Sequence, residues 1–201
     1  MDAPKTLGNA GERACRQALL RAPHINALTI LVDELRDSLG PGYLVPYFDP
    51  LDGGVRARVL YLLEAPGRKA VQSGFVSRNN PDETAKNFFL LNAEAGIPRE
   101  ATVIWNAVPW YIGTSTRIRA ANVSDVARAE DSLKRLLHLL TNLAFVVFVG
   151  TKARHARSVV ARERPDVRVR EIPHPSPMFV NRAPENRDRI LFVLKELSTQ
   201  L

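Results

Sequence analysis

The chain has 201 residues, of which 45% are hydrophobic, and this length suits one globular α/β domain. We expect a cytoplasmic protein without a membrane segment, because no apolar run approaches the roughly 20 residues that span a bilayer and the first residues lack the apolar core of a signal peptide. The net charge of +7 favours a polyanionic partner, although charge alone does not separate nucleic-acid binding from a merely basic protein.

The pattern of the first quarter of the chain predicts packing helices followed by an irregular connection. Apolar residues recur at helical spacing from Gly11 to Leu39, which predicts two helices with a break near Pro23. The stretch from Leu39 to Gly54 is dense in Gly, Pro and Asp, so we expect a loop there. We therefore treat residues 1–54 as helices and connection, and residues 55–201 as the α/β core, of one domain spanning residues 1–201.

Apolar, β-prone runs alternate with helical segments along the rest of the chain. Strands are expected at Ala57–Leu63, Thr102–Trp105, Ala144–Val149 and Val167–Ile172. Helices are expected around Asp82–Ala95, Ser124–Leu140, Lys152–Arg162 and Pro184–Leu197. With right-handed crossovers, this alternation predicts a three-layer α/β/α fold around a central four-stranded, mainly parallel sheet.

Unusual residues follow each predicted strand. The exits read Glu64-Ala65-Pro66-Gly67, Asn106-Ala107-Val108-Pro109-Trp110, Gly150-Thr151 and His174-Pro175-Ser176-Pro177. Each motif alone is consistent with an ordinary turn, loop or surface corner. Because ligands of open parallel sheets bind at the carboxyl ends of the strands, the shared placement of the four exits favours a binding site.

In this order, the motifs resemble those of the uracil-DNA glycosylase superfamily over roughly Val59 to Arg182. LLEAPG resembles the GEAPG motif of the iron-sulfur branch, SGFV its PFVG segment, VIWNAVPW its asparagine strand, and HPSPMFVNR the HPSPLS-type motif of the best-known branch. The resemblance implies the fold of that superfamily. It also implies a monofunctional DNA-repair glycosylase that flips uracil out of double- or single-stranded DNA and hydrolyses its N-glycosidic bond, leaving abasic-site DNA.

The resemblance assigns a uracil pocket to Ala65, Pro66, Gly67, Phe75 and Asn106. Phe75 is expected to stack on the flipped base, and the alternative is an ordinary core phenylalanine. Asn106 is expected to read the base edge, because its amide offers both a donor and an acceptor to uracil O4 and N3–H and leaves the cytosine edge unsatisfied.

Catalysis is assigned to His174 and Glu64. His174 is expected to donate a hydrogen bond to O2 of the departing uracil, where negative charge develops, and the alternative is a structural or solvent-facing histidine. Glu64 is expected to position the attacking water, because the Asp of the best-known branch aligns with Ala65, whose methyl group cannot. A salt-bridged strand-end role for Glu64 is equally consistent, and Asp82 or Glu83 would then take its place.

The resemblance also assigns residues that contact DNA outside the pocket. Met178 or Phe179 is expected to fill the gap that the flipped nucleotide leaves, while one of the two packs inward. Phosphate contacts are expected from Ser176 and Arg182. The basic rim is expected to include Arg68 and, from the segment 113–119, Arg117.

Two departures from the family limit what carries over. Only one cysteine, Cys15, is present, so the four-cysteine cluster is excluded, and we expect a monomer that uses no metal or cofactor. Gly67 stands where the best-known branch has a Tyr that excludes thymine, which leaves open a glycosylase for another deaminated base such as hypoxanthine. Ala65 leaves open a non-catalytic binder of abasic or damaged DNA. A soluble nucleoside hydrolase is a third alternative, with little salt-sensitive affinity for DNA.

Overall fold

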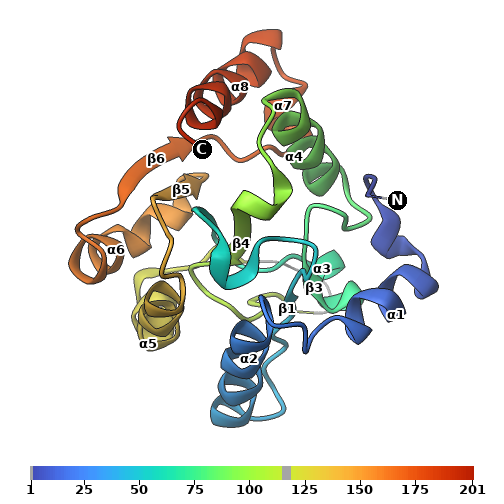
Figure 1. Cartoon of the computed structure of the whole chain (residues 1–201), viewed down its shortest axis with the longest axis vertical. Helices are drawn as coiled ribbons and strands as arrows, with labels where there is room; N and C mark the ends of the chain where they lie inside the picture. The colour runs from blue at the N-terminus through green and yellow to red at the C-terminus, as the bar shows by residue number, and fades with distance from the viewer. Residues whose placement is uncertain (1, 115–118) are drawn as a thin grey trace.

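The computed structural model describes residues 2–114 and 119–201 and contains a central, fully parallel four-stranded sheet between two groups of helices (Figure 1). The strand order is β4-β2-β5-β6. The strands are β2 (Val59–Leu63), β4 (Thr102–Asn106), β5 (Phe145–Val149) and β6 (Arg168–Ile172). Every strand overlaps its predicted run, so the predicted α/β class with a parallel sheet is confirmed.

The burial of the strand residues matches the positions of the strands in the sheet. The residues of β2, β4 and β5 are almost wholly buried and, apart from Thr102 and Asn106 at the two ends of β4, apolar, as expected where helices cover both faces of a parallel sheet. Strand β6 lies at the sheet edge, and its more polar sequence RVREI is only partly buried until Ile172. The hydrophobic core therefore lies along β2, β5 and the other edge strand, β4.

The longer helices form two groups, and capping side chains mark where α4 and α5 begin. Helices α2 (Asn26–Leu39), α5 (Val123–Leu139) and α6 (Arg157–Glu163) pack in sequence on one side, and α4 (Glu83–Glu94) and α8 (Pro184–Ser198) pack together on the other. The Asp82 carboxylate caps α4, and Asn122 with Asp125 forms a capping box on α5. The stretch before α6 is a 3₁₀ turn, η4 (Lys152–Ala156).

The N-terminal part follows the predicted break. Helix α1 (Ala10–Ala18), preceded by η1 (Thr6–Gly8), ends well before Pro23, and α2 begins after it. The connection that follows contains a short strand not expected from sequence, β1 (Tyr47–Phe48), paired in parallel with β3 (Phe75–Val76). Other short elements not expected are α3 (Arg68–Ser73), α7 (Pro177–Val180), and the 3₁₀ turns η2 (Gly54–Arg56) and η3 (Arg99–Ala101).

The turn before β2 requires glycine for a steric reason. A Cβ atom on Gly53 would lie 1.9 Å from the Glu100 carbonyl oxygen, and one on Gly54 would lie 2.0 Å from the His24 carbonyl oxygen. Gly54 also has φ of +57°. The two glycines therefore let this turn pack directly against η3 and the start of α2. No helix in the described part of the chain is long and apolar enough to cross a membrane.

Candidate active site

A pocket of about 370 Å³ opens at the carboxyl ends of β2 and β4. Its walls come from the exit of β2, helix α3, the segment between β3 and α4, the end of β4 and the loop after β6. The lining side chains relevant to the site are Ala65, Pro66, Gly67, Arg68, Val76, Asn80, Asp82, Phe88, Asn106 and His174. Four segments far apart in sequence therefore meet where the strand exits predicted a binding site.

Asn106 is the last residue of β4 and is paired in register with Leu63 of β2. Its side chain is 2% exposed and lines the pocket. The amide Nδ2 is buried and has no hydrogen-bond partner among the described residues. A buried N–H group without a partner costs about 1–3 kcal/mol, so this donor is left unsatisfied by the described part of the protein.

His174 reaches the pocket from the loop after β6. The loop packs closely on Gly150, which follows β5 with φ of +84°, and a Cβ atom there would lie 3.2 Å from His174 Cβ. Asn87 of α4 also holds the loop, since its Nδ2 donates a 3.0 Å hydrogen bond to the Pro175 carbonyl oxygen. The loop that carries His174 is therefore held from two sides, at Gly150 and at Asn87.

The protonation state of His174 is set by its surroundings. Desolvation by the pocket walls lowers the pKa of the imidazole below its usual value, although part of its surface remains open to solvent. The carboxylates of Glu64 and Asp82 oppose this shift without reversing it. His174 is therefore neutral at pH 7, a state in which the ring donates one hydrogen bond without carrying a charge.

The carboxylates near His174 do not have equal access to the pocket. Glu64 turns to the loop before α5, where its Oε1 accepts a 2.6 Å hydrogen bond from the Ala121 N–H, and it is absent from the pocket lining. Asp82 lines the pocket. Its Oδ1 accepts from the Ala85 N–H at 2.9 Å, and its Oδ2 has no hydrogen-bond partner among the described residues. Glu83 is exposed and pairs with Lys5 and Lys86.

Phe75 does not occupy the position expected of a base-stacking residue. Its ring is 1% exposed and packs in a small apolar cluster with Leu7 and Leu20, and it does not line the pocket. The pairing of β3 with β1 directs Phe75 into this cluster, whereas the next residue, Val76, lines the pocket. This is a correction of the placement expected from the SGFV segment.

The aromatic side chain that does line the pocket is Phe88 of α4. It packs edge-to-face against Tyr61 of β2, with ring centroids 4.8 Å apart. The sequence analysis predicted a helix around Asp82–Ala95 and assigned Phe88 no role. Nothing in the local pattern distinguished it from a core residue, since its role depends on the approach of α4 to the strand ends.

Of the residues predicted to contact DNA, Arg68 lines the pocket, and Ser176 and Phe179 line a separate hollow that His174 also lines. Met178 on α7 is 87% exposed, while Phe179 is partly buried and packs against the core. The Ser176 Oγ accepts from the Phe179 N–H at 3.3 Å and caps α7. Arg182 is exposed and forms no ion pair with any other described residue. Arg68 is exposed on the pocket rim; Arg117 lies outside the described residues.

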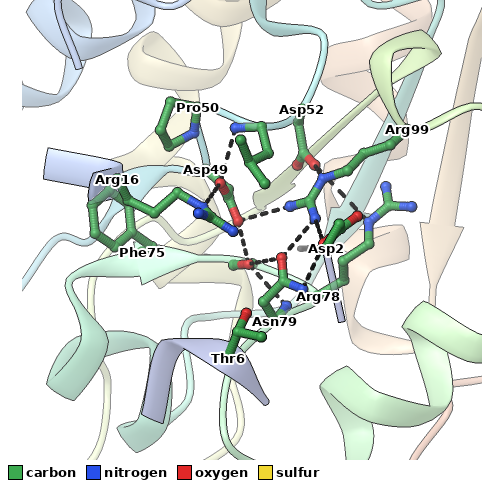
Figure 2. A network of polar contacts seen from close by, with 12 residues as sticks. Asp2, Thr6, Arg16, Asp49, Pro50, Asp52, Phe75, Arg78, Asn79 and Arg99 are labelled. Carbon is green, nitrogen blue, oxygen red and sulfur yellow. Dashed lines mark hydrogen bonds and ion pairs between the residues drawn. The ribbon is translucent and has the colours of Figure 1, made fainter. Parts of the chain in front are cut away.

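A buried ionic network lies beside the pocket and was not predicted (Figure 2). Asp49 accepts hydrogen bonds from Arg16 Nε at 3.0 Å and from Arg99 Nη2 at 2.8 Å, as well as from the Ser77 hydroxyl. Arg99 also donates to Asn79 Oδ1 at 2.6 Å. The network therefore fixes the segment that continues, through Asn80 and Asp82, into the pocket wall.

Asp52 is the least well satisfied member of this network. Burial raises its pKa to about 6, even though Arg99 and Arg78 favour the carboxylate. Arg99 Nε donates to its Oδ1 at 2.9 Å, whereas Arg78 Nε is 3.9 Å from the same oxygen. Asp52 Oδ2 and Arg78 Nε are both left without a hydrogen-bond partner among the described residues.

Two further features bear on what the pocket accepts. A Cβ atom on Gly67 would meet no heavy atom within 4 Å, so this side of the pocket has room for a substituent on the ligand. Among the described residues, no group of three or more His, Cys, Asp or Glu side chains is arranged to hold a metal ion. Cys15 is exposed and unpaired.

Comparison with known proteins gives one sequence match and several structural ones. The family described as the uracil DNA glycosylase superfamily matches residues 50–198. The SMUG2 protein of Pedobacter heparinus superposes with a TM-score of 0.54 at 13% identity, covering 89% of this chain and 86% of its own. A candidate uracil DNA glycosylase of Methanosarcina acetivorans superposes with a TM-score of 0.50 at 13% identity, covering 71% and 91%. No curated protein sequence matches.

Proposed function

Since the chain belongs to the uracil DNA glycosylase superfamily, we propose that it is a DNA-repair enzyme that flips uracil out of DNA and hydrolyses its N-glycosidic bond. The observation that carries this proposal is the Asn106 amide, which is buried at the pocket and has an unpartnered Nδ2. Uracil O4 is an acceptor for that donor, and uracil N3–H is a donor for the amide oxygen. Cytosine presents an amino group where uracil presents O4, so Nδ2 would stay unpartnered.

His174 is the group that stabilises the departing base. When the C1′–N1 bond breaks, its electron pair moves to uracil, and negative charge develops chiefly at O2 while the sugar becomes positively charged. A neutral imidazole fixed at the pocket donates a hydrogen bond to that oxygen as its charge grows. The lowered pKa of His174 supports this role, because the ring does not need to be protonated beforehand.

Asp82 is the carboxylate that we assign to the attacking water. It lines the pocket and keeps one oxygen free of other described residues, while Glu64 is bound to the loop at Ala121. The water oxygen bonds to C1′, and its proton passes to Asp82. The products are an abasic site and the uracil anion, which takes a proton from solvent after it leaves, while Asp82 returns its proton to solvent. Glu64 then acts through its field on His174, which raises the pKa of the imidazole.

DNA binding is assigned to the rim of the pocket. Met178 is the wedge that enters the base stack, because it is exposed while Phe179 packs inward. Arg68, on the pocket rim, and Arg182, which follows α7, are exposed cations to which we assign phosphate contacts. Ser176 already caps α7 through its oxygen, so its remaining capacity for a phosphate is its hydroxyl proton.

The test is release of base from labelled oligonucleotides that carry one uracil, hypoxanthine or mismatched thymine, incubated with the protein in EDTA and then cleaved with alkali at abasic sites. The proposal expects strand cleavage that depends on uracil and repeated turnover with excess substrate. Binding of abasic DNA without turnover would assign the protein to the non-catalytic binders instead. Release from free nucleosides only would assign it to the nucleoside hydrolases.

A glycosylase for another deaminated base is the second candidate, and the open space at Gly67 favours it. The backbone there has φ of −77°, so a larger residue is tolerated without strain. In the same assay, Gly67→Tyr narrows this side of the pocket. If wild-type protein accepts thymine or hypoxanthine and Gly67→Tyr retains only uracil, the open space determines the range of substrates.

A further inference from the structure

A second hollow adjoins the base pocket along helix α3. It has a volume of about 320 Å³ and lies between the Gly42–Leu44 segment, α3 and the loop Tyr111–Thr114. Arg68 lines both this hollow and the base pocket, so the two lie on either side of one side chain. We call the side chains Leu44, Arg68, Val71, Gln72 and Tyr111 that line it the α3 furrow.

The α3 furrow has an apolar and aromatic interior with polar groups at its edge. Leu44 is 50% exposed, and the Tyr111 N–H donates a 3.0 Å hydrogen bond to the Leu44 carbonyl oxygen, which ties the two walls together. A Cβ atom on Gly113 would lie 2.3 Å from Tyr111 Cζ, so glycine is needed for the ring to lie where it does. Gln72 and Arg68 are exposed on α3 and supply amide and cationic groups.

This combination fits a nucleobase. Proteins that bind single-stranded DNA combine an aromatic ring, on which a base stacks, with cations that follow the backbone. A base flipped into the pocket holds its strand at the rim, so a neighbouring nucleotide is within reach of the α3 furrow. A base that enters a hollow lined by protein side chains leaves the stack of its own strand.

We propose that the α3 furrow binds the unstacked base of a nucleotide adjacent to the flipped one. The proposal rests on the proposed function in one respect, because a base held in the pocket is what brings the strand to the furrow. The contacts are stacking on Tyr111, apolar contact with Leu44 and Val71, and a phosphate at Arg68.

The test combines base deletion in the substrate with deletion of the furrow side chain. Single-stranded oligonucleotides carry one uracil, and the base of one neighbouring nucleotide at a time is replaced by hydrogen. For wild-type protein, removing the base at one particular neighbouring position lowers the single-turnover kcat/KM about tenfold, the loss expected when one base–aromatic stack is removed. Tyr111→Ser lowers kcat/KM on the intact strand by a similar factor. In this variant, removing the neighbouring base causes no further loss.

Phe192→Ser is the matched control, since Phe192 is an exposed aromatic on α8, 64% accessible and outside the furrow. The control variant keeps the wild-type rate and the wild-type dependence on the neighbouring base. Gly113→Ala keeps the Tyr111 ring but displaces it. Like Tyr111→Ser, it makes kcat/KM depend less on the neighbouring base. The proposal would be overturned if the losses in kcat/KM from Tyr111→Ser and from the base deletion simply multiplied in the doubly changed complex. Equal rates on every base-deleted strand would also overturn it.

A failure of the proposed function is distinguishable from a failure of the furrow. The same oligonucleotides, with a reduced abasic site at the uracil position, are used for equilibrium binding by fluorescence anisotropy. If no uracil is released from any strand but the neighbouring base still strengthens binding and Tyr111→Ser removes that effect, the furrow stands and the glycosylase assignment falls. Release of uracil with no effect of any neighbouring base in either assay gives the reverse conclusion.

Discussion

The base pocket and the ionic network of Figure 2 are adjacent buried polar regions that differ in how their polar groups are satisfied. Asp49 in the network accepts from Arg16, Arg99 and the Leu51 N–H. Asn106 in the pocket is equally inaccessible, but its Nδ2 has no partner among the described residues. A buried group with partners stabilises a fold, whereas one without partners costs stability until a ligand supplies them.

The network also contains buried atoms without hydrogen-bond partners among the described residues, but unlike Asn106 Nδ2 they belong to charged side chains of opposite sign. Asp52 Oδ2 and Arg78 Nε belong to oppositely charged side chains that face each other, with Arg78 Nε 3.9 Å from Asp52 Oδ1. Each of these groups therefore has a charge that compensates it within the protein. Asn106 has its free donor in a pocket large enough for a ligand. The comparison separates a structural region from a functional one, and substitutions in each should have different effects.

The largest effect is expected from breaking the network. Arg99→Met leaves Asp49 and Asp52 buried with fewer compensating groups and lowers the free energy of unfolding by about 3–5 kcal/mol. Arg21→Met is the control, because Arg21 pairs with Asp33 at the surface with 66% of its side chain exposed; its loss stays below about 1 kcal/mol. Urea unfolding measures both. Equal losses in the two variants would mean that the network has no special role in stability.

Substituting His174 tests the functional side of the comparison. His174→Ala removes the donor to the departing base and lowers the single-turnover rate of uracil release by roughly 10²–10³, or about 2.7–4 kcal/mol. The free energy of unfolding changes little, since the imidazole is partly open to solvent. Affinity for uracil-containing duplex stays near the wild-type value because phosphate contacts are unchanged. A normal rate in this variant would refute the role of the histidine.

A pair of carboxylate substitutions sharpens the assignment of the water-positioning group. Asp82→Asn lowers the chemical rate by about 100-fold, at the lower end for loss of a general base. Asparagine caps helices as well as aspartate does, so α4 and the free energy of unfolding are preserved. Glu64→Gln keeps an acceptor for the Ala121 N–H and lowers the rate only a few fold. The opposite ranking of the two variants would return the role to Glu64.

The smallest effect is expected in the pH profile. Because the pKa of His174 is lowered, the folded protein keeps this ring neutral at pH values where the unfolded chain, with a pKa near 6.5, takes up a proton. The associated stability is present above about pH 6.5 and is lost as pH falls below it. The rate of uracil release should likewise hold through pH 6.5 and fall only at lower pH. If the rate of uracil release instead fell with a midpoint at pH 6.5, and His174→Ala abolished that transition, the pKa of His174 would not be lowered.

The sheet was predictable because its signal is local. Strands β2, β4 and β5 are largely apolar, buried runs, and the exits after β2, β4 and β6 lie together because parallel strands end at one edge. The positions of Asn106 and His174 at the pocket follow from that rule alone. Helix bounds were predictable to within a few residues, since Asp82, Asn122 and Pro184 are strong local start signals.

The network and the aromatic wall were not predictable because they depend on long-range packing. Asp49, Arg99 and Arg16 come from three distant segments, and no spacing in the sequence links them. Phe75 and Phe88 are both apolar positions, and only the short pairing of β1 with β3 turns Phe75 away from the pocket. For the same reason, which of Met178 and Phe179 is exposed became clear only once α7 was placed.

The most direct measurement is paired kinetics and unfolding of Asn106→Ala. The account predicts that release of uracil from single-uracil oligonucleotides in EDTA falls by about 100-fold or more. It also predicts a free energy of unfolding at or above that of wild-type protein, because the variant removes a buried amide whose Nδ2 lacks a partner. Wild-type turnover by the variant, or a large loss of stability without loss of turnover, would contradict the claim that this amide is held for the base.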